Sequence, residues 1–223
     1  YMSIKYLKKA IKTPSSDDNK TRAAVQSILN DIEKRREQSI KEITKIIYSI
    51  IDIETTGGKF NEERITEIAI FKIDDKGNTI KYHKLINPQK KIQPFVKKLT
   101  GISDEMLIDK PLFSELVNEI DEFTKNSIFI AHNVNFDYRV LKDEFHRCQR
   151  KFIRKTLCTI ELSKNVFPNE NSYSLGKLVS SLGIEIKNRH RADGDAMATL
   201  KLFKKICLNL NKKQLSKFIK INQ

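Results

Sequence analysis

A short apolar run that carries two acids constrains the fold of this chain more than any other feature. Residues 46–53 read IIYSIIDI, a run rich in β-branched side chains and typical of a buried strand. Because side chains alternate along a strand, Asp52 and Glu54 lie on one face while Ile51 and Ile53 point to the other. Two neighbouring carboxylates in a buried place need protons or a cation to offset desolvation and repulsion. The run therefore predicts a buried strand with a metal site.

The ligand atoms indicate which ion such a site would hold. Carboxylate oxygens without cysteine favour Mg²⁺ or Mn²⁺ over Zn²⁺. The alternative is an edge strand that leaves both acids in water, and the surrounding isoleucines argue against it. The cysteines lack metal-type spacing and fit reduced thiols inside a cell; they are Cys148, Cys158 and Cys207.

Strand and helix patterns alternate along the rest of the chain. Residues 65–73 and 79–86 flank the turn sequence DKGN and predict an antiparallel meander with the first strand. Shorter strands are expected at residues 127–132 and 155–159. Helical patterns occupy residues 94–101, 112–123, 136–147, 159–165, 174–182 and 195–208. This order predicts an α/β fold, in which helices flank a mixed β-sheet.

The two ends of the chain differ from its middle in charge. The net charge is +14, with 11 Lys and Arg against 6 Asp and Glu in residues 1–47, and 7 against none in residues 200–223. Basic flanks around a nearly neutral middle would attract a polyanion, although lysine-rich ends can also be plain solvated faces. We expect residues 1–46 to form a basic helical extension and residues 209–223 a basic tail. The helix is predicted from the spacing of Val25, Ile28, Leu29 and Ile32.

Two further motifs place acids at predicted helix starts. The sequence HNVNFD puts Asp137 in the first turn of a helix, where a carboxylate gains from the positive helix end. Alone, Asp137 would more often be a helix cap. The sequence HRADGDA places Asp195 at another helix start, with His190 five residues before it. Asp193 could cap that helix and receives no metal role, and a lone histidine is usually an ordinary surface or packing residue.

The motifs DxETTG, HNxxFD and HxAxxDA occur in this order, about 80 and about 60 residues apart. In this the chain resembles the DEDDh exonucleases, the DnaQ-like family that includes the proofreading subunit of bacterial replicative polymerase, RNase T and oligoribonuclease. The resemblance covers residues 47–208, includes the segment KIQPFVKKLTGISDEML, and implies an RNase H-like exonuclease domain. The tyrosine branch of the superfamily would have Tyr where this chain has Arg191, so the histidine branch is favoured.

The resemblance implies a mechanism and a set of site residues. Two Mg²⁺ or Mn²⁺ ions would be held by Asp52, Glu54, Asp137 and Asp195, and His190 would act as the base. The expected activity is 3'→5' removal of nucleoside 5'-monophosphates from single-stranded nucleic acid, with DNA favoured. Substrate contacts are expected from Thr55, Thr56, Gly57, His132, Asn133 and Phe136.

Other interpretations remain open at this point. An RNA-trimming 3' exoribonuclease has the same motifs, and so would a non-catalytic nucleic-acid-binding subunit that keeps the fold. A DNA polymerase or another repair protein is a possible partner. No run of about 18 apolar residues is present, so we expect a soluble cytoplasmic protein without a membrane partner. Residues 1–46 are also faintly similar to the N-terminal arm of histidinol-dehydrogenase-type enzymes, from which we predict no dehydrogenase activity.

Overall fold

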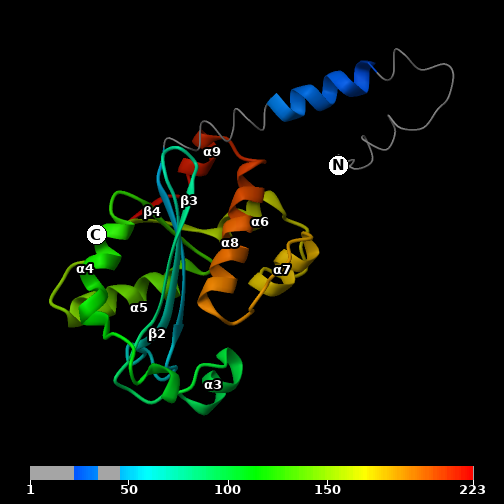
Figure 1. Ribbon diagram of the computed structural model, residues 1–223. Helices are drawn as coiled ribbons and strands as arrows, with labels where there is room; N and C mark the ends of the chain where they lie inside the picture. The colour runs from blue at the N-terminus through cyan, green and yellow to red at the C-terminus, as the bar shows by residue number, and fades with distance from the viewer. Residues whose placement is uncertain (1–22, 35–45, 223) are drawn as a thin grey trace.

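A six-stranded β-sheet organises the part of the chain that the computed structural model describes, residues 23–34 and 46–222 (Figure 1). The strands are β1 (Tyr48–Thr55), β2 (Ile65–Ile73), β3 (Thr79–Leu85), β4 (Ile128–Ala131), β5 (Lys155–Cys158) and β6 (Lys220–Ile221). Their order in the sheet is β3-β2-β1-β4-β5-β6. β1, β2 and β3 form the expected antiparallel meander, and β4 and β5 continue the sheet in parallel with β1.

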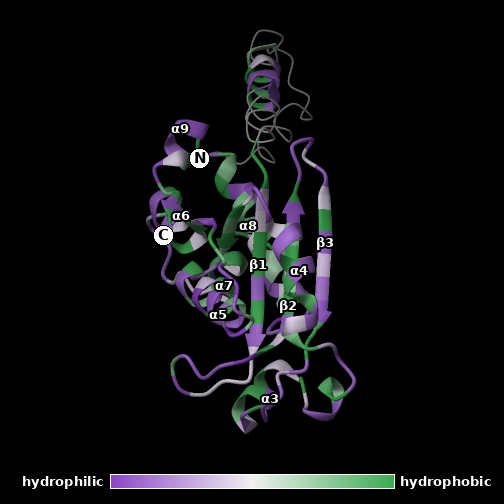
Figure 2. Cartoon of the chain, turned by 90° about the vertical axis from the view of Figure 1, so that its left-hand side faces the viewer, coloured by the Kyte–Doolittle hydropathy of each residue, from purple (hydrophilic) through white to green (hydrophobic). Residues whose placement is uncertain are grey.

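The position of β1 excludes the edge-strand alternative. β1 is paired with β2 on one side and with β4 on the other, so both of its edges are covered. Its side chains alternate as predicted: Tyr48 and Ile50 belong to one hydrophobic core, and Ile51 and Ile53 belong to the core on the opposite face. Figure 2 shows that β1 changes from hydrophobic to hydrophilic toward its C-terminal end.

Helices cover both faces of the sheet (Figure 1). They are α4 (Phe113–Thr124), α5 (Val134–Arg147), α6 (Thr159–Val166), α7 (Leu175–Ser181) and α8 (Ala192–Cys207). Helices α4 and α5 bury their apolar faces against Ile51 and Ile53, whereas α6, α7 and α8 pack on the side of Tyr48 and Ile50. The predicted mixed sheet flanked by helices is therefore confirmed.

A short helical segment closes the C-terminal end of β1. It contains α3 (Pro94–Thr100) and the 3₁₀ turn η1 (Glu105–Leu107). As expected from the sequence, α3 stops at Gly101, whose φ of 71° is left-handed. The backbone N–H of Gln93 donates to the carbonyl of Thr56, 3.0 Å away, and this bond ties the segment to the chain that leaves β1.

The two ends of the chain are described in part. Residues 23–34 form a helix that carries the predicted apolar positions. Residues 1–22 and 35–45 of the expected extension lie outside the described residues, and so does most of the segment that is similar to a dehydrogenase arm. At the other end, α9 (Lys212–Ser216) leads into β6, which pairs with β5. The division into an extension, a domain and a tail stays a prediction. Within the described residues, we find no helix long and apolar enough to cross a membrane.

Candidate active site

Three of the predicted acids meet at the C-terminal end of β1. Asp52 and Glu54 lie on the face of β1 that α8 covers, and Asp195 lies in the first turn of α8. Ligand oxygens of these three residues are all within 4.8 Å of one another. Asp52 and Glu54 share a face because side chains alternate along a strand. Asp195 is 141 residues after Glu54 in the sequence, and the packing of α8 on β1 brings it beside them.

The fourth acid, Asp137, approaches from the other side of the sheet. It lies in the first turn of α5, which begins just after β4, the parallel neighbour of β1. Asp137 is 4% exposed, and its charge raises the pKa of Asp52. Asp137 is not one of the three residues with oxygens within 4.8 Å of one another, but its charge acts on Asp52, as do the charges of Glu54 and Asp195.

Burial and mutual repulsion disfavour the charged forms of these acids. Burial, followed by the charges of Asp137, Glu54 and Asp195, raises the pKa of Asp52 well above its usual range. Burial, together with the charges of Asp195 and Glu67, raises the pKa of Glu54 to about 7. Burial also raises the pKa values of Asp137 and Asp195. A bound cation would reverse this preference, because it stabilises the ionised carboxylates.

The donor set fits a hard divalent cation. All of the convergent ligand atoms are carboxylate oxygens, which suits Mg²⁺ or Mn²⁺. Moreover, Oδ1 of Asp195 is buried and has no hydrogen-bond partner, which is costly for a carboxylate unless an ion satisfies it.

His190 stands beside this cluster on the segment that precedes α8. Its φ of 59° is left-handed, and its backbone N–H donates to Oδ2 of Asp195, 3.3 Å away. The segment is packed tightly on α8, since a Cβ on Gly194 would overlap the backbone oxygens of Lys187 and Asn188. The predicted histidine and the last predicted acid are therefore brought together through the backbone, and the imidazole stays partly exposed.

Glu67 is a central residue that the sequence interpretation missed. It lies opposite Glu54 on β2, and its side chain is fully buried. Its carboxylate accepts two bonds from Arg191, at 3.0 and 2.7 Å, one from the backbone N–H of Ala192 at 2.9 Å, and pairs with Nε2 of His83 at 2.7 Å. Burial alone would raise the pKa of Glu67, but these hydrogen bonds hold it below its usual value. Glu67 thus joins β2 to the start of α8.

One sequence signal could have pointed to Glu67. It is an acid within ITEIAIFKI, which was interpreted only as a strand, and an acid in a buried strand needs a partner. The position where the tyrosine branch has Tyr is filled here by Arg191, which is bound to Glu67. Asp193 lies in the first turn of α8 and pairs with Lys81 at 3.2 Å.

Thr55, Thr56 and Gly57, the substrate contacts predicted at the end of β1, take part in the local backbone structure. Thr55 accepts a hydrogen bond from the N–H of Gly57, and Thr56 accepts one from the N–H of Arg64. Both threonines are buried. Gly57 has a φ of 67°, and a Cβ there would lie 2.8 Å from Val96, so only glycine fits without a shift. Their contact with substrate stays a prediction, and of the three only Gly57 is more than slightly exposed.

The predicted contacts near α5 occupy different environments. Nδ1 of His132 is 2.9 Å from Oγ1 of Thr159 and Nε2 is 2.8 Å from the carbonyl of Tyr173, so a substrate contact would require one of these bonds to break. Asn133 precedes α5 with a left-handed φ of 74° and is exposed. Phe136 is 37% exposed. Asn133 and Phe136 are therefore accessible to a ligand, whereas His132 is tied into the protein.

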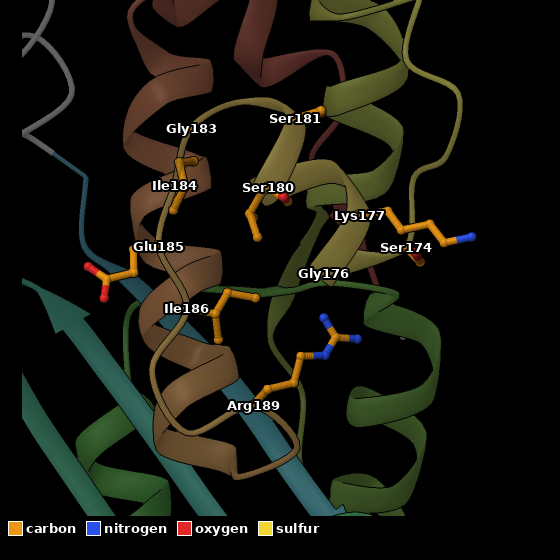
Figure 3. Close-up of a pocket in the computed structure, with 11 residues that line it drawn as sticks. Ser174, Gly176, Lys177, Ser180, Ser181, Gly183, Ile184, Glu185, Ile186 and Arg189 are labelled. Carbon is orange, nitrogen blue, oxygen red and sulfur yellow. The ribbon is translucent and has the colours of Figure 1, made fainter.

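Figure 3 shows a shallow pocket of about 1010 Å³ on the side of α7. It is lined by α7 and the segment 183–189, which leads to His190. The side chain of Arg189 points toward Gly176 in Figure 3, and a Cβ on Gly176 would overlap its guanidinium. None of the four acids lines this pocket. The pocket lies where the segment 183–189, which leads to His190, packs on α7.

Comparison with known proteins agrees with the fold and the motifs. The exonuclease family model matches residues 49–203. The 3'-5' exonuclease DinG of Staphylococcus epidermidis is 36% identical over 156 residues, which are 70% of this chain and 17% of that protein. The Staphylococcus aureus protein of the same name is 37% identical over the same length. The chain spans 17% of the length of these curated relatives.

Two solved structures show the same fold. Exonuclease I of E. coli, in complex with a dT13 oligonucleotide, has a TM-score of 0.66 and 21% identity, and the match covers 74% of this chain and 41% of that one. Exonuclease X, in complex with 5' overhanging duplex DNA, has a TM-score of 0.59 and 23% identity, and the match covers 77% and 98%. The predicted RNase H-like sheet is thereby confirmed. The family model covers more than half of the residues of this chain, and the chain therefore belongs to the DEDD-type exonuclease family of metal-dependent hydrolytic nucleases.

Proposed function

We propose that this chain is a 3'→5' exonuclease that removes nucleotides one at a time from the 3' end of single-stranded DNA, with two Mg²⁺ or Mn²⁺ ions as cofactors. The observation that carries the proposal is the meeting of Asp52, Glu54 and Asp195 within 4.8 Å, with Asp137 beside them. These acids come from three elements, β1, α5 and α8, and share raised pKa values, which indicates a site adapted to cations.

Each acid would act as a metal ligand. Asp52 and Glu54 offer their oxygens from a rigid central strand, and Asp195 offers the unpartnered Oδ1 from α8. Asp137 completes the set from the start of α5, where the helix end favours its charge. When bound, the ions supply positive charge that activates water and stabilises the leaving 3' oxygen.

His190 would accept the proton of the attacking water. Histidine is the side chain that most often takes this role in enzymes, and His190 lies next to the cluster and is partly exposed. The left-handed backbone of His190 and the close packing on Gly194 hold it there. The products would be nucleoside 5'-monophosphates.

Similar proteins support the activity and DNA as the substrate. The relatives from Staphylococcus are named 3'-5' exonucleases, and the two solved neighbours are complexes with a dT13 oligonucleotide and with 5' overhanging duplex DNA. The oligonucleotide complex supports single-stranded DNA, whereas the 3' end of a 5' overhanging duplex is recessed and paired. We infer that single-stranded 3' ends are the substrate and that the chain works in the cytoplasm. We also propose a DNA polymerase or another repair protein as a partner.

One assay tests the proposal. The full chain is mixed with matched 5'-labelled single-stranded DNA, duplex DNA or RNA, in the presence of Mg²⁺, Mn²⁺ or a chelator. Single-stranded DNA should shorten from its 3' end in single-nucleotide steps, and only with metal. Asp52→Asn should slow this by about 100-fold or more, because it removes a ligand charge. Asp75→Asn, the same change on an exposed turn, should have wild-type activity.

Other outcomes would change the assignment. Faster shortening of RNA than of DNA would favour an RNA-trimming enzyme. Binding of every strand without shortening of any would favour a non-catalytic nucleic-acid-binding subunit. Wild-type activity of Asp52→Asn in a clean preparation would show that the acidic cluster is not the active site.

A further inference from the structure

An exposed aromatic ring lies on the loop that leaves β1. Phe60 is 72% exposed, compared with 62% for Phe95 and 37% for Phe136, the other exposed phenylalanines of the described residues. A single exposed apolar side chain is common on protein surfaces and by itself indicates nothing. Phe60 differs from such a side chain because charged residues hold its ring and its loop in place.

Phe60 forms the outer layer of a stack whose inner ring, Phe136, is the sequence neighbour of Asp137. The guanidinium carbon of Arg139 lies 4.2 Å from the ring centroid of Phe60 and 5.6 Å from that of Phe136. Phe136 is the residue before Asp137, one of the four acids. We call Phe60, Arg139 and Phe136 the Phe60 stack.

The charge of Arg139 is already balanced. Its guanidinium donates to Glu63 at 2.9 and 3.3 Å, to Asp143 at 3.4 Å, and to the side chain of Asn61 at 3.1 Å. The hydrogen bonds of Arg139 lower the pKa of Glu63, although burial opposes this, so the pair is ionised at neutral pH. Arg139 is therefore poorly placed to bind a phosphate, and it serves to support the ring of Phe60.

The loop that presents Phe60 is held from two sides. Arg147 of α5 donates to the backbone carbonyls of Asn61 and Glu63, at 3.0 and 3.3 Å. Lys90 donates to the carbonyl of Glu62 at 2.7 Å. A ring that is fixed before binding loses little conformational entropy when a ligand stacks on it.

We propose that the Phe60 stack binds an unpaired base of the substrate strand, on the 5' side of the nucleotide that is removed. This rests on the proposed function. Since the 3' end of the strand lies at the acids, any more distant surface can meet only nucleotides on its 5' side. An apolar ring face binds the face of any base and so needs no particular sequence. Bases within a duplex are already stacked on their neighbours, so the surface favours single strands.

The test compares four variants of the full chain. Phe60→Ala removes the ring, Phe60→Leu keeps apolar bulk without it, and Phe60→Trp keeps an aromatic face. Ile221→Ala is the matched control, because Ile221 is 75% exposed but lies on β6 at the far edge of the sheet. Binding of labelled oligothymidylates of increasing length is measured with Ca²⁺ in place of Mg²⁺. Hydrolysis is measured on an oligothymidylate and on thymidine 5'-monophosphate p-nitrophenyl ester.

Phe60→Ala and Phe60→Leu should weaken binding of the longer strands by roughly 5- to 20-fold, whereas Phe60→Trp and Ile221→Ala should bind like the wild type. In Phe60→Ala, the ratio of kcat/KM for the oligonucleotide to that for the ester should fall about 10-fold, because the ester has no base on the 5' side.

Two results would overturn the proposal. One is wild-type binding by Phe60→Ala at every strand length, or equal binding by the Leu and Trp variants. The other is an equal loss on ester and oligonucleotide, which would mean that Phe60 only supports the active site. If the wild type hydrolyses neither substrate while Phe60→Ala still weakens binding of the longer strands, the proposed function fails and the base-binding surface stands.

Discussion

At the scale of single residues, the carboxylate of Glu67 connects the acidic cluster to its support. It is fully buried, and it bonds Arg191, His83 and the N–H of Ala192 at the start of α8. Asp195 lies one turn further along α8, so its position depends on this junction.

Glu67→Gln should destabilise the protein and slow hydrolysis. Glutamine has one acceptor oxygen and a donor group that would face the guanidinium of Arg191, so a partly buried charge would lose its partner. We expect the free energy of unfolding of this variant, measured in urea, to be about 2–4 kcal/mol lower than that of the wild type. Lys81→Ala, which breaks the exposed pair with Asp193, should change the free energy by about 0.5 kcal/mol or less. Equal effects of the two changes would contradict the role of Glu67.

His190→Ala should separate proton transfer from metal binding. The contact of His190 to Asp195 is made by the backbone N–H, which alanine keeps. We expect turnover to fall by about 10²–10⁴-fold while Mn²⁺ binds as in the wild type, measured by calorimetry. Weaker Mn²⁺ binding in the variant would mean that the imidazole is itself a ligand.

At the scale of elements, the fit of α8 against the segment before it positions His190. Gly194 lies on the face of α8 that meets the backbone of Lys187 and Asn188, and a Cβ there overlaps both carbonyl oxygens. Backbone cannot yield as a flexible side chain can, so alanine at this position would displace the segment that carries His190.

Gly194→Ala should therefore reduce turnover by about 10-fold or more and lower stability by about 1–3 kcal/mol. The matched change is Gly183→Ala, at the start of the same segment. A Cβ there has open space, but its φ of 68° costs an alanine about 1 kcal/mol. That variant should lose stability and keep its turnover, as measured by thermal unfolding and the oligonucleotide assay. Unchanged turnover in Gly194→Ala would refute this account of α8.

The elements themselves follow largely from local sequence. The alternation around Asp52, the left-handed stop at Gly101 and the helix starts before Asp137 and Asp195 are local signals, and the structure has strands and helices where they predict them. By contrast, β6 is two residues long and exists only because it pairs with β5. Such a strand has no pattern of its own to find.

The candidate site divides in the same way. The acids and His190 could be predicted as site residues because three motifs occur in the order and spacing of a known family. Glu67 could not be assigned from spacing, since its partner Arg191 is 124 residues away and only the packing of α8 on β2 joins them. Likewise, both ring nitrogens of His132 are engaged by Thr159 and Tyr173, and no motif reports such bonds.

At the scale of the whole molecule, the acidic cluster links metal binding, pH and stability. Burial raises the pKa of Glu54 from 4.5 to about 7 and raises those of Asp52 and Asp137. Without metal, these carboxyls therefore bind more protons in the folded protein than in the unfolded chain between about pH 4.5 and about pH 8. Their contribution to stability is full below that range and falls as the pH rises through it. Metal ions need the ionised carboxylates, so their stabilising effect should grow over the same range.

Thermal unfolding with a chelator and with Mg²⁺, at about pH 5 and about pH 8, should show this directly. In chelator the melting temperature should be lower at the higher pH, and Mg²⁺ should raise it mainly there, by several degrees (~4–8 °C). Asp137→Asn places a neutral group where the buried carboxylate was, so without metal it should be more stable than the wild type at the higher pH and gain less from Mg²⁺. A metal-free wild type that is more stable at about pH 8 than at about pH 5 would show that the cluster does not govern this response. Equal stabilisation of both proteins by Mg²⁺ would remove Asp137 from the metal site.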